Sequence, residues 1–355
     1  MIINFLIIIQ EIKMENLELE IEKLREELSS IYRDEEKIVY VINTIMEQLK
    51  IASLRCDNAI AISRNMKYEI FDPRVVANQG ICYPVIKSTE ETLQEILDKK
   101  CSIARFGDGE FAIMANRERQ KFQNLNLELG KRLREVIRTQ DERLLIGIAD
   151  NYGNLEKFTQ DAADKIRVYM TDEIRREQMQ FLDLKRVYGN AYVTRPYVLM
   201  ADNRTDAPKK RFENWKKVWD TRNVIIVEGA ESRLGVGNDL FDNVLTLRRI
   251  IAPATNSYDR YPDILKSALN NAKRDDLFLI ALGPAAGVMA YDLTQEGYQA
   301  IDLGHLDLEY EWFLAGEGKR VQVVHKYNNE FPGDERAQPI IDSTYEAQKI
   351  ADFSS

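Results

Sequence analysis

The chain has 355 residues, of which 45% are hydrophobic and 30% charged, the ordinary composition of a globular protein long enough to bury a large core. Its formal net charge of −9 argues against a dominant nucleic-acid-binding role, which normally requires a basic surplus. Three cysteines without a CxxC pair indicate a reducing compartment and no cysteine-based metal site, and the spacing of His305 and His325 excludes an HExxH zinc site.

The chain begins with a short apolar stretch, MIINFLIIIQ, that runs directly into charged sequence. This stretch is too short to span a bilayer and has neither a basic leader nor a small-residue cleavage site, so we expect no secretory signal. We therefore predict a cytoplasmic protein, with weak contact of this stretch at the inner face of the membrane as the alternative. A native start at Met14 is a further alternative for residues 1–13.

The next segment carries a regular apolar spacing with gaps that alternate between four and three residues. The apolar residues are Leu17, Ile21, Leu24, Leu28, Ile31, Ile38, Ile42, Ile45, Leu49 and Ala52. This is the a/d seam of a coiled coil over about five heptads, with one charged a position at Glu35. We predict that residues 1–63 form an N-terminal helix and that residues 17–52 make the chain a homo-oligomer. The alternative is an amphipathic helix that packs back on its own domain.

Residues 64–88 lose this spacing and contain Pro73, Gly80 and Pro84, which indicates a linker. Short β-rich runs then alternate with helical segments over residues 89–330, and a tail follows over residues 331–355. The predicted strands are CSIARF (101–106), RLLIGIA (143–149), AYVTRPY (191–197), NVIIVEG (223–229), LRRIIAP (247–253), DLFLIAL (276–282) and QAIDLG (299–304). The predicted helices cover residues 129–140, 155–178, 211–221, 261–274 and 285–297. This alternation predicts an α/β, Rossmann-like fold with a mostly parallel sheet flanked by helices.

In such a fold, ligands bind beyond the carboxyl ends of the strands. Five predicted strands are followed by GDGE, AESRLGVGNDLF, ATNSYDRY, GPAAG and HLDLEYEW, all rich in glycine, polar or charged residues. We expect these five loops to meet at one edge of the sheet. GPAAG opens a helix whose free amides suit an anion, although an ordinary turn explains it equally well. The stretch RLGVGNDLF lacks a third glycine, which argues against a nicotinamide cofactor, and its Arg233 is a candidate phosphate ligand.

The segment HLDLEYEW places His305, Asp307, Glu309 and Glu311 at every second residue. On a strand these four side chains would share one face, and on a helix His305 and Glu309 would be neighbours. Either geometry gathers carboxylates beside a histidine, which suits a general base or a set of ligands for sugar hydroxyls. The alternative is an acidic first helical turn favoured by the helix dipole.

Two carboxylates, Asp108 and Glu110, follow the strand CSIARF in the sequence GDGE, close to Arg105. Mg²⁺ and Mn²⁺ prefer carboxylate oxygens and commonly take substrate phosphates as further ligands. We therefore interpret this DxE pair as a divalent-metal site for the diphosphate of a nucleotide. The alternative is an ordinary turn, in which glycine and aspartate are common.

Four blocks in this order, ARFGDGEF, EGAESRLGVGNDLFDN, ALGPAAGVMAYDL and QAIDLGHLDLEYEWF, resemble the bacterial glycosyltransferases of the GT-D fold. The resemblance covers residues 85–330 and leaves out the N-terminal helix. It implies a Rossmann-like domain, a UDP-sugar donor and a divalent metal, Mn²⁺ or Mg²⁺, with the DxE motif at Asp108 and Glu110.

On this basis we predict a metal-dependent enzyme that transfers a hexose from a UDP-sugar to a glycan or glycoprotein acceptor, in protein glycosylation or polysaccharide biosynthesis. The predicted nucleotide-sugar site comprises Arg105, Phe106, Gly107, Gly109, Glu228, Arg233, Gly235, Gly237, Asp239, Gly283 and Pro284. The predicted catalytic residues are His305, Asp307, Glu309 and Glu311, one of which would act on the acceptor hydroxyl. The alternative function is an inactive nucleotide-sugar-binding scaffold that acts through its coiled coil. A third hypothesis, a methyltransferase or dehydrogenase, is supported by the Rossmann-like pattern alone.

Overall fold

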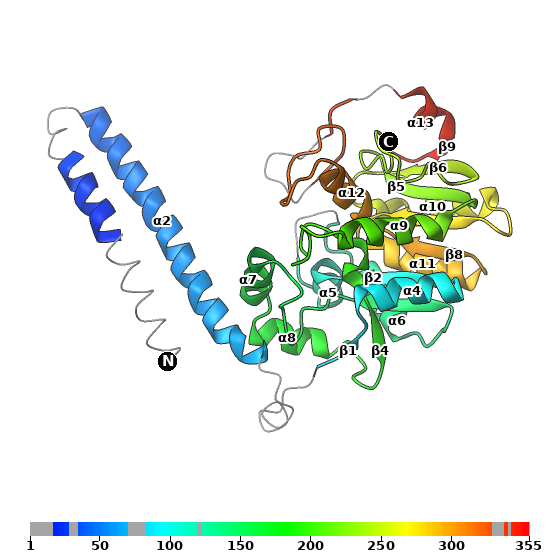
Figure 1. The fold of residues 1–355 in the computed structure, drawn as a ribbon, viewed down its shortest axis with the longest axis horizontal. Coiled ribbons are helices and arrows are strands. Elements are labelled where there is room, and N and C mark those ends of the chain that lie inside the picture. The colour runs from blue at the N-terminus through cyan, green and yellow to red at the C-terminus, as the bar shows by residue number, and fades with distance from the viewer. Residues whose placement is uncertain are drawn as a thin grey trace. The chain divides into compact units, whose positions relative to one another are not determined.

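The computed structural model describes residues 17–27, 35–69, 83–118, 123–328, 337–339 and 342–354. The chain forms two compact units, Met1–Arg64 and Asn65–Ser355. Figure 1 labels many of their helices and strands, and the second unit contains the whole described sheet.

The first unit is helical wherever the structure describes it. Residues 17–27 are helical, and α2 spans Glu35–Asn65. The seam residues Leu28 and Ile31 lie outside the described residues, as does the apolar stretch 1–13, so the coiled coil over residues 17–52 stays a prediction. Ile42 and Leu49 of the predicted seam are exposed. No helix in the described ranges combines the length and the hydropathy needed to cross a bilayer.

In the described part of the second unit, nine parallel strands form one sheet in the order β1-β4-β3-β2-β8-β7-β5-β6-β9. The strands are β1 (Val85–Ile86), β2 (Ser102–Phe106), β3 (Leu144–Ile148), β4 (Val187–Asn190), β5 (Asn223–Gly229), β6 (Thr246–Ala252), β7 (Leu277–Ala281), β8 (Gln299–Asp302) and β9 (Lys349–Asp352). The central strands β5 and β7 are almost entirely buried apolar runs, as expected for strands covered on both faces. The predicted α/β class with a parallel sheet is confirmed.

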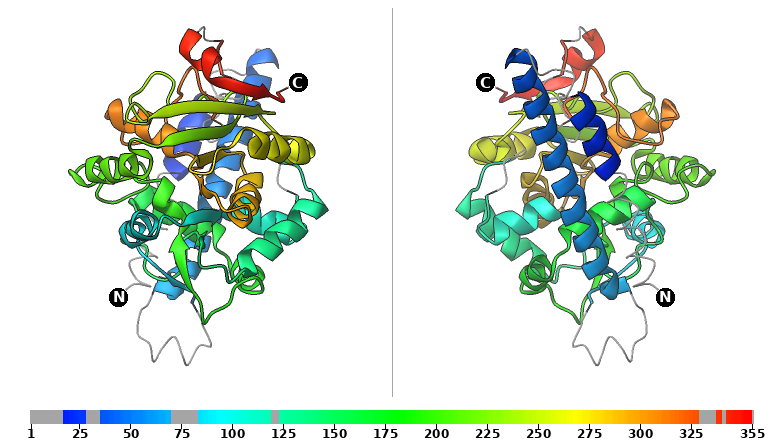
Figure 2. Two further views of the ribbon diagram at one scale, coloured as in Figure 1. Left: turned by 90° about the vertical axis from the view of Figure 1, so that its right-hand side faces the viewer. Right: turned by 90° about the vertical axis from the view of Figure 1, so that its left-hand side faces the viewer.

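Helices cover both faces of this sheet, as Figure 2 shows. They are α4 (Thr89–Lys99), α5 (Asp108–Met114), α6 (Leu127–Arg138), α7 (Gln160–Tyr169), α8 (Asp172–Met179), α9 (Ala207–Trp219), α10 (Tyr261–Asn271), α11 (Ala285–Gln295), α12 (Leu306–Leu314) and α13 (Ser343–Gln348), with the short 3₁₀ turns η1 (Met66–Glu69), η2 (Ala191–Thr194) and η3 (Ser257–Arg260). Successive strand residues enter different cores because their side chains point to opposite faces. Ile225 and Val227 of β5 join the core formed with α6, α10 and α11. Val224 and Ile226 join the core formed with α4 and α9.

Two of the elements predicted before β5 differ from those in the structure. The predicted strand AYVTRPY (191–197) is wrong, because β4 ends at Asn190 and η2 follows. Asn190 caps this turn, since its side-chain oxygen accepts the Tyr192 N–H at 2.9 Å. The predicted helix 155–178 consists of α7 and α8, because the Thr171 hydroxyl accepts the Ile174 N–H at 3.3 Å and starts a second helix.

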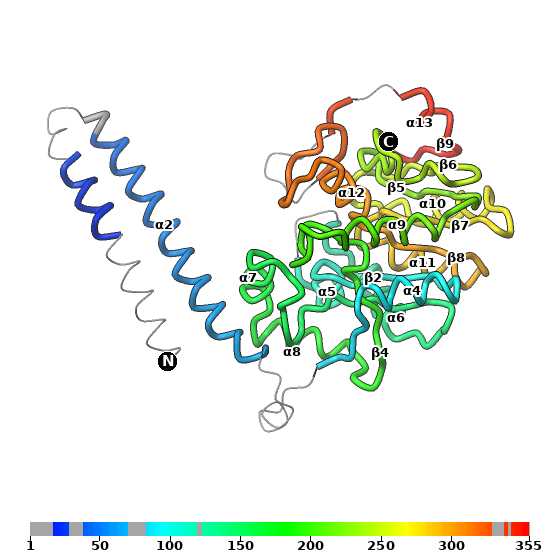
Figure 3. The backbone as a smooth tube through the Cα atoms, in the orientation of Figure 1, coloured from blue at the N-terminus to red at the C-terminus, as the bar shows by residue number. Residues whose placement is uncertain are grey.

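The ranges assigned to a linker and a tail also contain ordered elements. Residues 64–88 include the end of α2, the turn η1 and the strand β1. The segment 331–355 contributes β9, which is the edge strand of the sheet and lies next to β6 (Figure 3). Its Ala351 lies opposite Ile250 of β6. The end of the described chain is therefore part of the sheet.

Strands β2 and β8 are neighbours in the sheet, with Ile103 opposite Ile301, although they are far apart in the sequence. From β2 the chain continues to β3 on one side, whereas β8 leads toward β9 at the opposite edge. In open parallel sheets, ligands bind beyond the carboxyl ends of two neighbouring strands whose connections run in opposite directions. The fold thus places the DxE pair, after β2, and the histidine-led segment, after β8, at the expected binding position.

Candidate active site

A cavity of about 380 Å³ opens at the carboxyl edge of the sheet. The residues that line it after successive strands include Asp108 after β2, Asn151 after β3, Tyr192 after β4, Ser232 after β5, Pro253 after β6, Gly283 after β7 and His305 after β8. All five loops expected at one edge of the sheet contribute to this cavity. They meet there because every strand of the sheet runs in the same direction.

Arg105, near the end of β2, forms an ion pair with Asp302 at the end of β8. Its Nη2 lies 2.6 Å from Oδ1 of Asp302, and its Nε donates to the Asp302 carbonyl oxygen at 2.9 Å. Gly304 packs against the guanidinium with a φ of 50°, and a Cβ there would lie 2.0 Å from Nη2 of Arg105. This contact fixes the turn between β8 and α12. Arg105 lines the cavity, but Asp302 already uses Nε and Nη2, which limits its use as a phosphate ligand.

The predicted metal ligands Asp108 and Glu110 are the first and third residues of α5, and both line the cavity. Oε2 of Glu110 accepts the Gly107 N–H at 2.7 Å and so caps the helix. Burial, and to a smaller extent the charges of Asp302 and Asp108, raises the pKa of Glu110 to about 7. A negative charge is therefore costly at this position, and a bound cation would offset that cost.

These two carboxylates fit a divalent cation that shares its ligands with a substrate. Mg²⁺ in particular is usually held by one or two carboxylates together with water and phosphate oxygens. Within the described ranges, no group of three or more His, Cys, Asp or Glu side chains is placed to hold a metal ion. An ion at Asp108 and Glu110 would therefore need further oxygen ligands from outside the chain.

The segment HLDLEYEW forms α12, with His305 directly before its first residue, which settles the alternative between strand and helix. His305 and Asp307 line the cavity, whereas Glu309 and Glu311 do not. Asp307 is held on both oxygens. Its Oδ1 accepts the Gly235 N–H at 2.9 Å, and its Oδ2 lies 2.6 Å from a buried lysine, Lys326.

Glu309 is fully buried and binds the loop that follows η2. Its Oε2 accepts the backbone N–H groups of Tyr197 at 3.1 Å and Val198 at 2.9 Å. Arg195, in the same loop, places Nη2 3.0 Å from Nδ1 of His305. In this geometry Glu309 holds a backbone segment, and its predicted role in catalysis finds no support.

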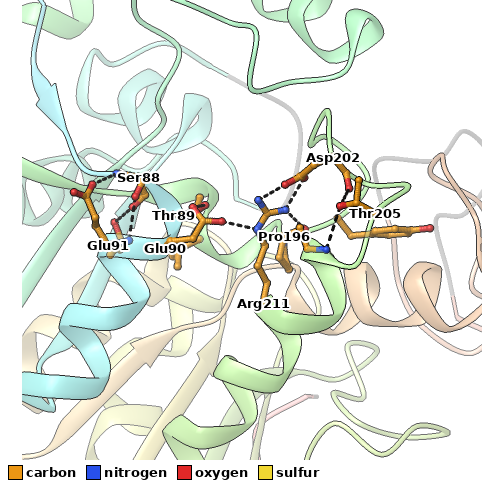
Figure 4. A network of polar contacts seen from close by, with 12 residues as sticks. Ser88, Thr89, Glu90, Glu91, Pro196, Asp202, Thr205 and Arg211 are labelled. Atoms are coloured by element: carbon orange, nitrogen blue, oxygen red, sulfur yellow. Dashed lines mark hydrogen bonds and ion pairs between the residues drawn. The ribbon is translucent and has the colours of Figure 1, made fainter.

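The loop after η2 is also fixed from the side of α9, as Figure 4 shows. Arg211 of α9 donates to the Pro196 carbonyl oxygen at 3.3 Å and binds both carboxylate oxygens of Asp202 at 2.7 Å. Its Nε donates to Glu90, in the first turn of α4, at 2.7 Å. The loop that carries Arg195 is therefore held by α9 on one side and by α12 on the other.

The predicted nucleotide-sugar residues divide between the cavity wall and its support. Besides Arg105, those that line the cavity are Gly107, Gly109, Gly283 and Pro284. Those that lie elsewhere are Phe106, Glu228, Arg233, Gly235, Gly237 and Asp239.

The three charged residues outside the cavity form bonds that hold the loop after β5. Glu228 is buried, where it accepts the Leu234 N–H at 2.7 Å and lies 2.6 Å from Nη1 of Arg249. Arg233 donates to two backbone carbonyl oxygens, each at 2.7 Å. Asp239 accepts hydrogen bonds from a tyrosine and a lysine side chain, also at 2.7 Å. These contacts make the three charged residues supports of the loop.

The cavity is also lined by polar side chains for which the sequence predicts no role. They include Asn151, Lys165, Tyr192, Arg195, Ser232 and Arg320. Asn151 and Tyr192 follow strand ends, so the rule applied to the other loops finds them once β4 is placed correctly. Lys165 lies within α7 and Arg320 beyond α12, and neither position carries a local sequence signal.

The chain is similar to curated proteins and to solved structures. A family model described as glycosyltransferase GT-D fold matches residues 103–331. The chain is similar to the probable glycosyl transferase Gly of Streptococcus gordonii, with 35% identity over 272 residues that cover 76% of this chain and 39% of that protein. It is also similar to the glycosyltransferase GlyD of Streptococcus pneumoniae serotype 4, with 34% identity over 273 residues that cover 75% of this chain and 32% of that protein. The chain thus spans well under half the length of these curated relatives.

Solved structures resemble this chain over nearly their whole length. One, described as a new glycosyltransferase (DUF1792) from Streptococcus sanguinis, is 34% identical with a TM-score of 0.69, and the match covers 76% of this chain and 100% of that one. Another, described as the highly conserved domain of unknown function 1792 with a distinct glycosyltransferase fold, is 34% identical with a TM-score of 0.70, and the match covers 96% of that chain.

Proposed function

Because this chain belongs to the family of glycosyltransferases with the GT-D fold, we propose that it transfers a hexosyl group from a UDP-sugar to a glycan or glycoprotein acceptor. The family is the one that the four sequence blocks resemble. The observation that carries the proposal is the cavity at the carboxyl edge of the sheet, where the DxE pair, the GPAAG turn and His305 come together.

The charges around this cavity support an anionic donor. The whole chain has a net charge of −9, yet the basic side chains that line the cavity include Arg195 and Arg320. Guanidinium groups bind phosphate oxygens with good geometry. The amino end of α11, which follows Gly283 and Pro284, adds the partial positive charge of a helix terminus. A nucleotide diphosphate matches this arrangement.

We propose that Asp108 and Glu110 hold Mn²⁺ or Mg²⁺ beside the diphosphate. Both side chains line the cavity, and the raised pKa of Glu110 marks a position where a cation is favourable. When bound, the ion would neutralise negative charge on the diphosphate leaving group. Asp302 stabilises the end of β2, just before the DxE pair, since its Oδ2 accepts the backbone N–H of Arg105 at 3.3 Å.

Of the four predicted catalytic residues, His305 and Asp307 are the ones that the fold brings to the cavity. A general base needs an oxygen or nitrogen that is available to the proton it removes. Both oxygens of Asp307 are already engaged, by the Gly235 N–H and by Lys326. We therefore assign Asp307 to holding the cavity wall, which leaves His305 as the member of this group that contacts the donor.

The function is tested by calorimetric titration of UDP into the full chain with and without Mn²⁺, followed by a screen of sugar nucleotides for release of free UDP. We expect Mn²⁺ to strengthen UDP binding and at least one donor to be turned over. Metal-enhanced binding with no turnover of any donor would favour the alternative, an inactive nucleotide-sugar-binding scaffold. No binding of UDP under either condition would reject both functions.

We also propose that α2 associates with the same helix of a second copy. Apolar residues that recur at gaps of three and four form a surface that we call the α2 stripe. It consists of Val39, Ile42, Met46, Leu49, Cys56 and Ile60, all exposed, and Ser53 occupies the one polar position of the pattern. An exposed a/d pattern of this kind is usually buried against a partner helix, and a second copy presents the same pattern. The stripe shares Ile42 and Leu49 with the predicted seam.

A further inference from the structure

His305 and Arg195 contact each other at the wall of the cavity. Nη2 of Arg195 lies 3.0 Å from Nδ1 of His305, and both residues line the cavity. A guanidinium carries N–H donors and no acceptor, so Nδ1 of His305 must accept the hydrogen in this contact. A ring whose Nδ1 accepts a hydrogen bond is neutral and carries its one proton on Nε2, since the doubly protonated ring has two donors.

The contact is built into the fold. His305 directly precedes α12, and Glu309 lies four residues later in its first turn, so the two side chains lie on the same side of the helix start. The guanidinium of Arg195 lies against both, with Nη1 3.9 Å from Oε1 of Glu309. Oε2 of Glu309 accepts the N–H groups of Tyr197 and Val198, which holds the loop in the position that Arg195 requires.

The loop cannot move away from α12 without breaking contacts on its other side. Arg211 binds the Pro196 carbonyl oxygen and the Asp202 carboxylate, as Figure 4 shows. His305 itself follows Gly304, whose turn packs against the guanidinium of Arg105. Both partners of the contact are therefore positioned by the surrounding structure.

We propose that Arg195 fixes His305 as the neutral ring protonated on Nε2, so that His305 donates a hydrogen bond to the donor diphosphate and does not act as a general base. An imidazole N–H next to a guanidinium is well placed to donate a hydrogen bond to an anionic oxygen. The same ring is less well placed to take up a proton from a hydroxyl group. Arg195 is then a positioning residue that acts through His305. The diphosphate as ligand rests on the proposed function, whereas the state of the ring does not.

The state of the ring is tested by ¹⁵N spectroscopy of the imidazole groups at neutral pH. The chain has two histidines, His305 and His325, so a His325→Gln variant assigns both. We expect the Nε2-protonated form for His305 in the wild type and in Arg195→Lys, which keeps a cationic donor. In Arg195→Met we expect a mixture of the two neutral forms. A ring protonated on Nδ1, or on both nitrogens, in the wild type would overturn the proposal.

The role of the ring is tested by titrating UDP, in the presence of Mn²⁺, into variants of His305. Glutamine offers an oxygen that accepts from Arg195 and an N–H that donates to the ligand, but it cannot take up a proton. We expect His305→Gln to bind UDP within about threefold of the wild type. We expect His305→Ala to bind UDP on the order of 10- to 100-fold more weakly, as for a lost hydrogen bond to a charged group.

Equal losses in the two variants, or no loss in His305→Ala, would refute the role as a donor. If His305 instead acted as a general base, neither variant would retain that base, and the turnover rate of each would fall by about 10²–10⁴-fold. Should UDP bind to none of the proteins, the wild type included, the diphosphate assignment falls together with the proposed function. The ¹⁵N spectra still decide the state of the ring in that case, so the two failures are distinguishable.

Discussion

Nζ of Lys326 lies 2.6 Å from Oδ2 of Asp307, and the lysine side chain is only 2% exposed. The same nitrogen lies 2.7 Å from Oε1 of Glu311, one helical turn further along α12. Asp307 also accepts the Gly235 N–H from the loop after β5. One buried cation thus connects α12, the loop after β5 and the segment that follows α12.

Replacing this lysine should destabilise the second unit strongly. Lys326→Met leaves two carboxylates without their buried cation, and loss of one partner of a buried ion pair costs about 3–5 kcal/mol. Urea unfolding followed by near-ultraviolet circular dichroism measures the change in the free energy of unfolding. The exposed Lys319→Met is the matched control and should stay within about 0.5 kcal/mol of the wild type. Equal stability of the two variants would contradict the structural role of Lys326.

The raised pKa of Glu110 predicts a specific dependence of stability on pH. Below the ordinary pKa of 4.5 the carboxyl group is protonated in both states and contributes nothing. As the pH rises from 4.5 to about 7, the unfolded chain releases its proton while the folded chain keeps it, so the fold loses stability. The loss amounts to about 3 kcal/mol and stays constant at higher pH.

Glu110→Gln removes this loss but keeps an oxygen that can accept the Gly107 N–H. In the presence of a chelator, the stability of this variant relative to the wild type should therefore rise across the same pH range. Denaturant melts at several pH values measure the effect, and Glu142→Gln, at an exposed position, is the control. Parallel curves for Glu110→Gln and the wild type would show that the carboxyl group of Glu110 titrates normally.

Asp108→Asn tests the metal site without a large change in shape. We expect the variant to unfold at the same denaturant concentration as the wild type but to lose the gain in UDP affinity that Mn²⁺ provides, by at least about tenfold. Calorimetry with and without Mn²⁺ measures that gain. Asp275→Asn, at an exposed position just before β7 and outside the cavity, should leave the gain unchanged. A full Mn²⁺ effect in Asp108→Asn would remove this residue from the site.

The α2 stripe predicts self-association that charge can disrupt. In the double variant Ile42→Glu and Leu49→Glu, two carboxylates would have to be buried at the interface, which costs more than the contact gains. We expect light scattering to give a smaller particle for this variant than for the wild type. The control is Gln48→Glu, an exposed position of α2 outside the stripe. If the wild type is already a monomer at high concentration, association through α2 is wrong.

The sheet could be predicted because its strands carry strong local signals. NVIIVEG and DLFLIAL are apolar runs between polar turns, and they become the buried strands β5 and β7. AYVTRPY has the aromatic and β-branched residues of a strand as well, yet a hydrogen bond from Tyr192 to Asn190 turns the chain there. The short strand β9 depends on its neighbour β6 and carries no comparable signal of its own.

The site could be predicted at the level of loops but not at the level of side chains. Parallel strands bring the loops that follow them to one edge, which is why the loops after β2, β7 and β8 could be expected to lie together there. The roles within α12 depend on partners that are distant in the sequence. Glu309 accepts hydrogen bonds from the backbone of Tyr197 and Val198, and Glu311 forms an ion pair with Lys326. The spacing of residues within HLDLEYEW does not predict these contacts.

The cavity draws its wall from loops that leave seven different strands. These loops also bind one another, since Asp307 after β8 accepts the Gly235 N–H of the loop after β5, and Glu309 holds the loop that carries Arg195. A substitution in one loop can therefore displace a residue that another loop places in the cavity. For protein engineering, loops that share such bonds have to be exchanged together.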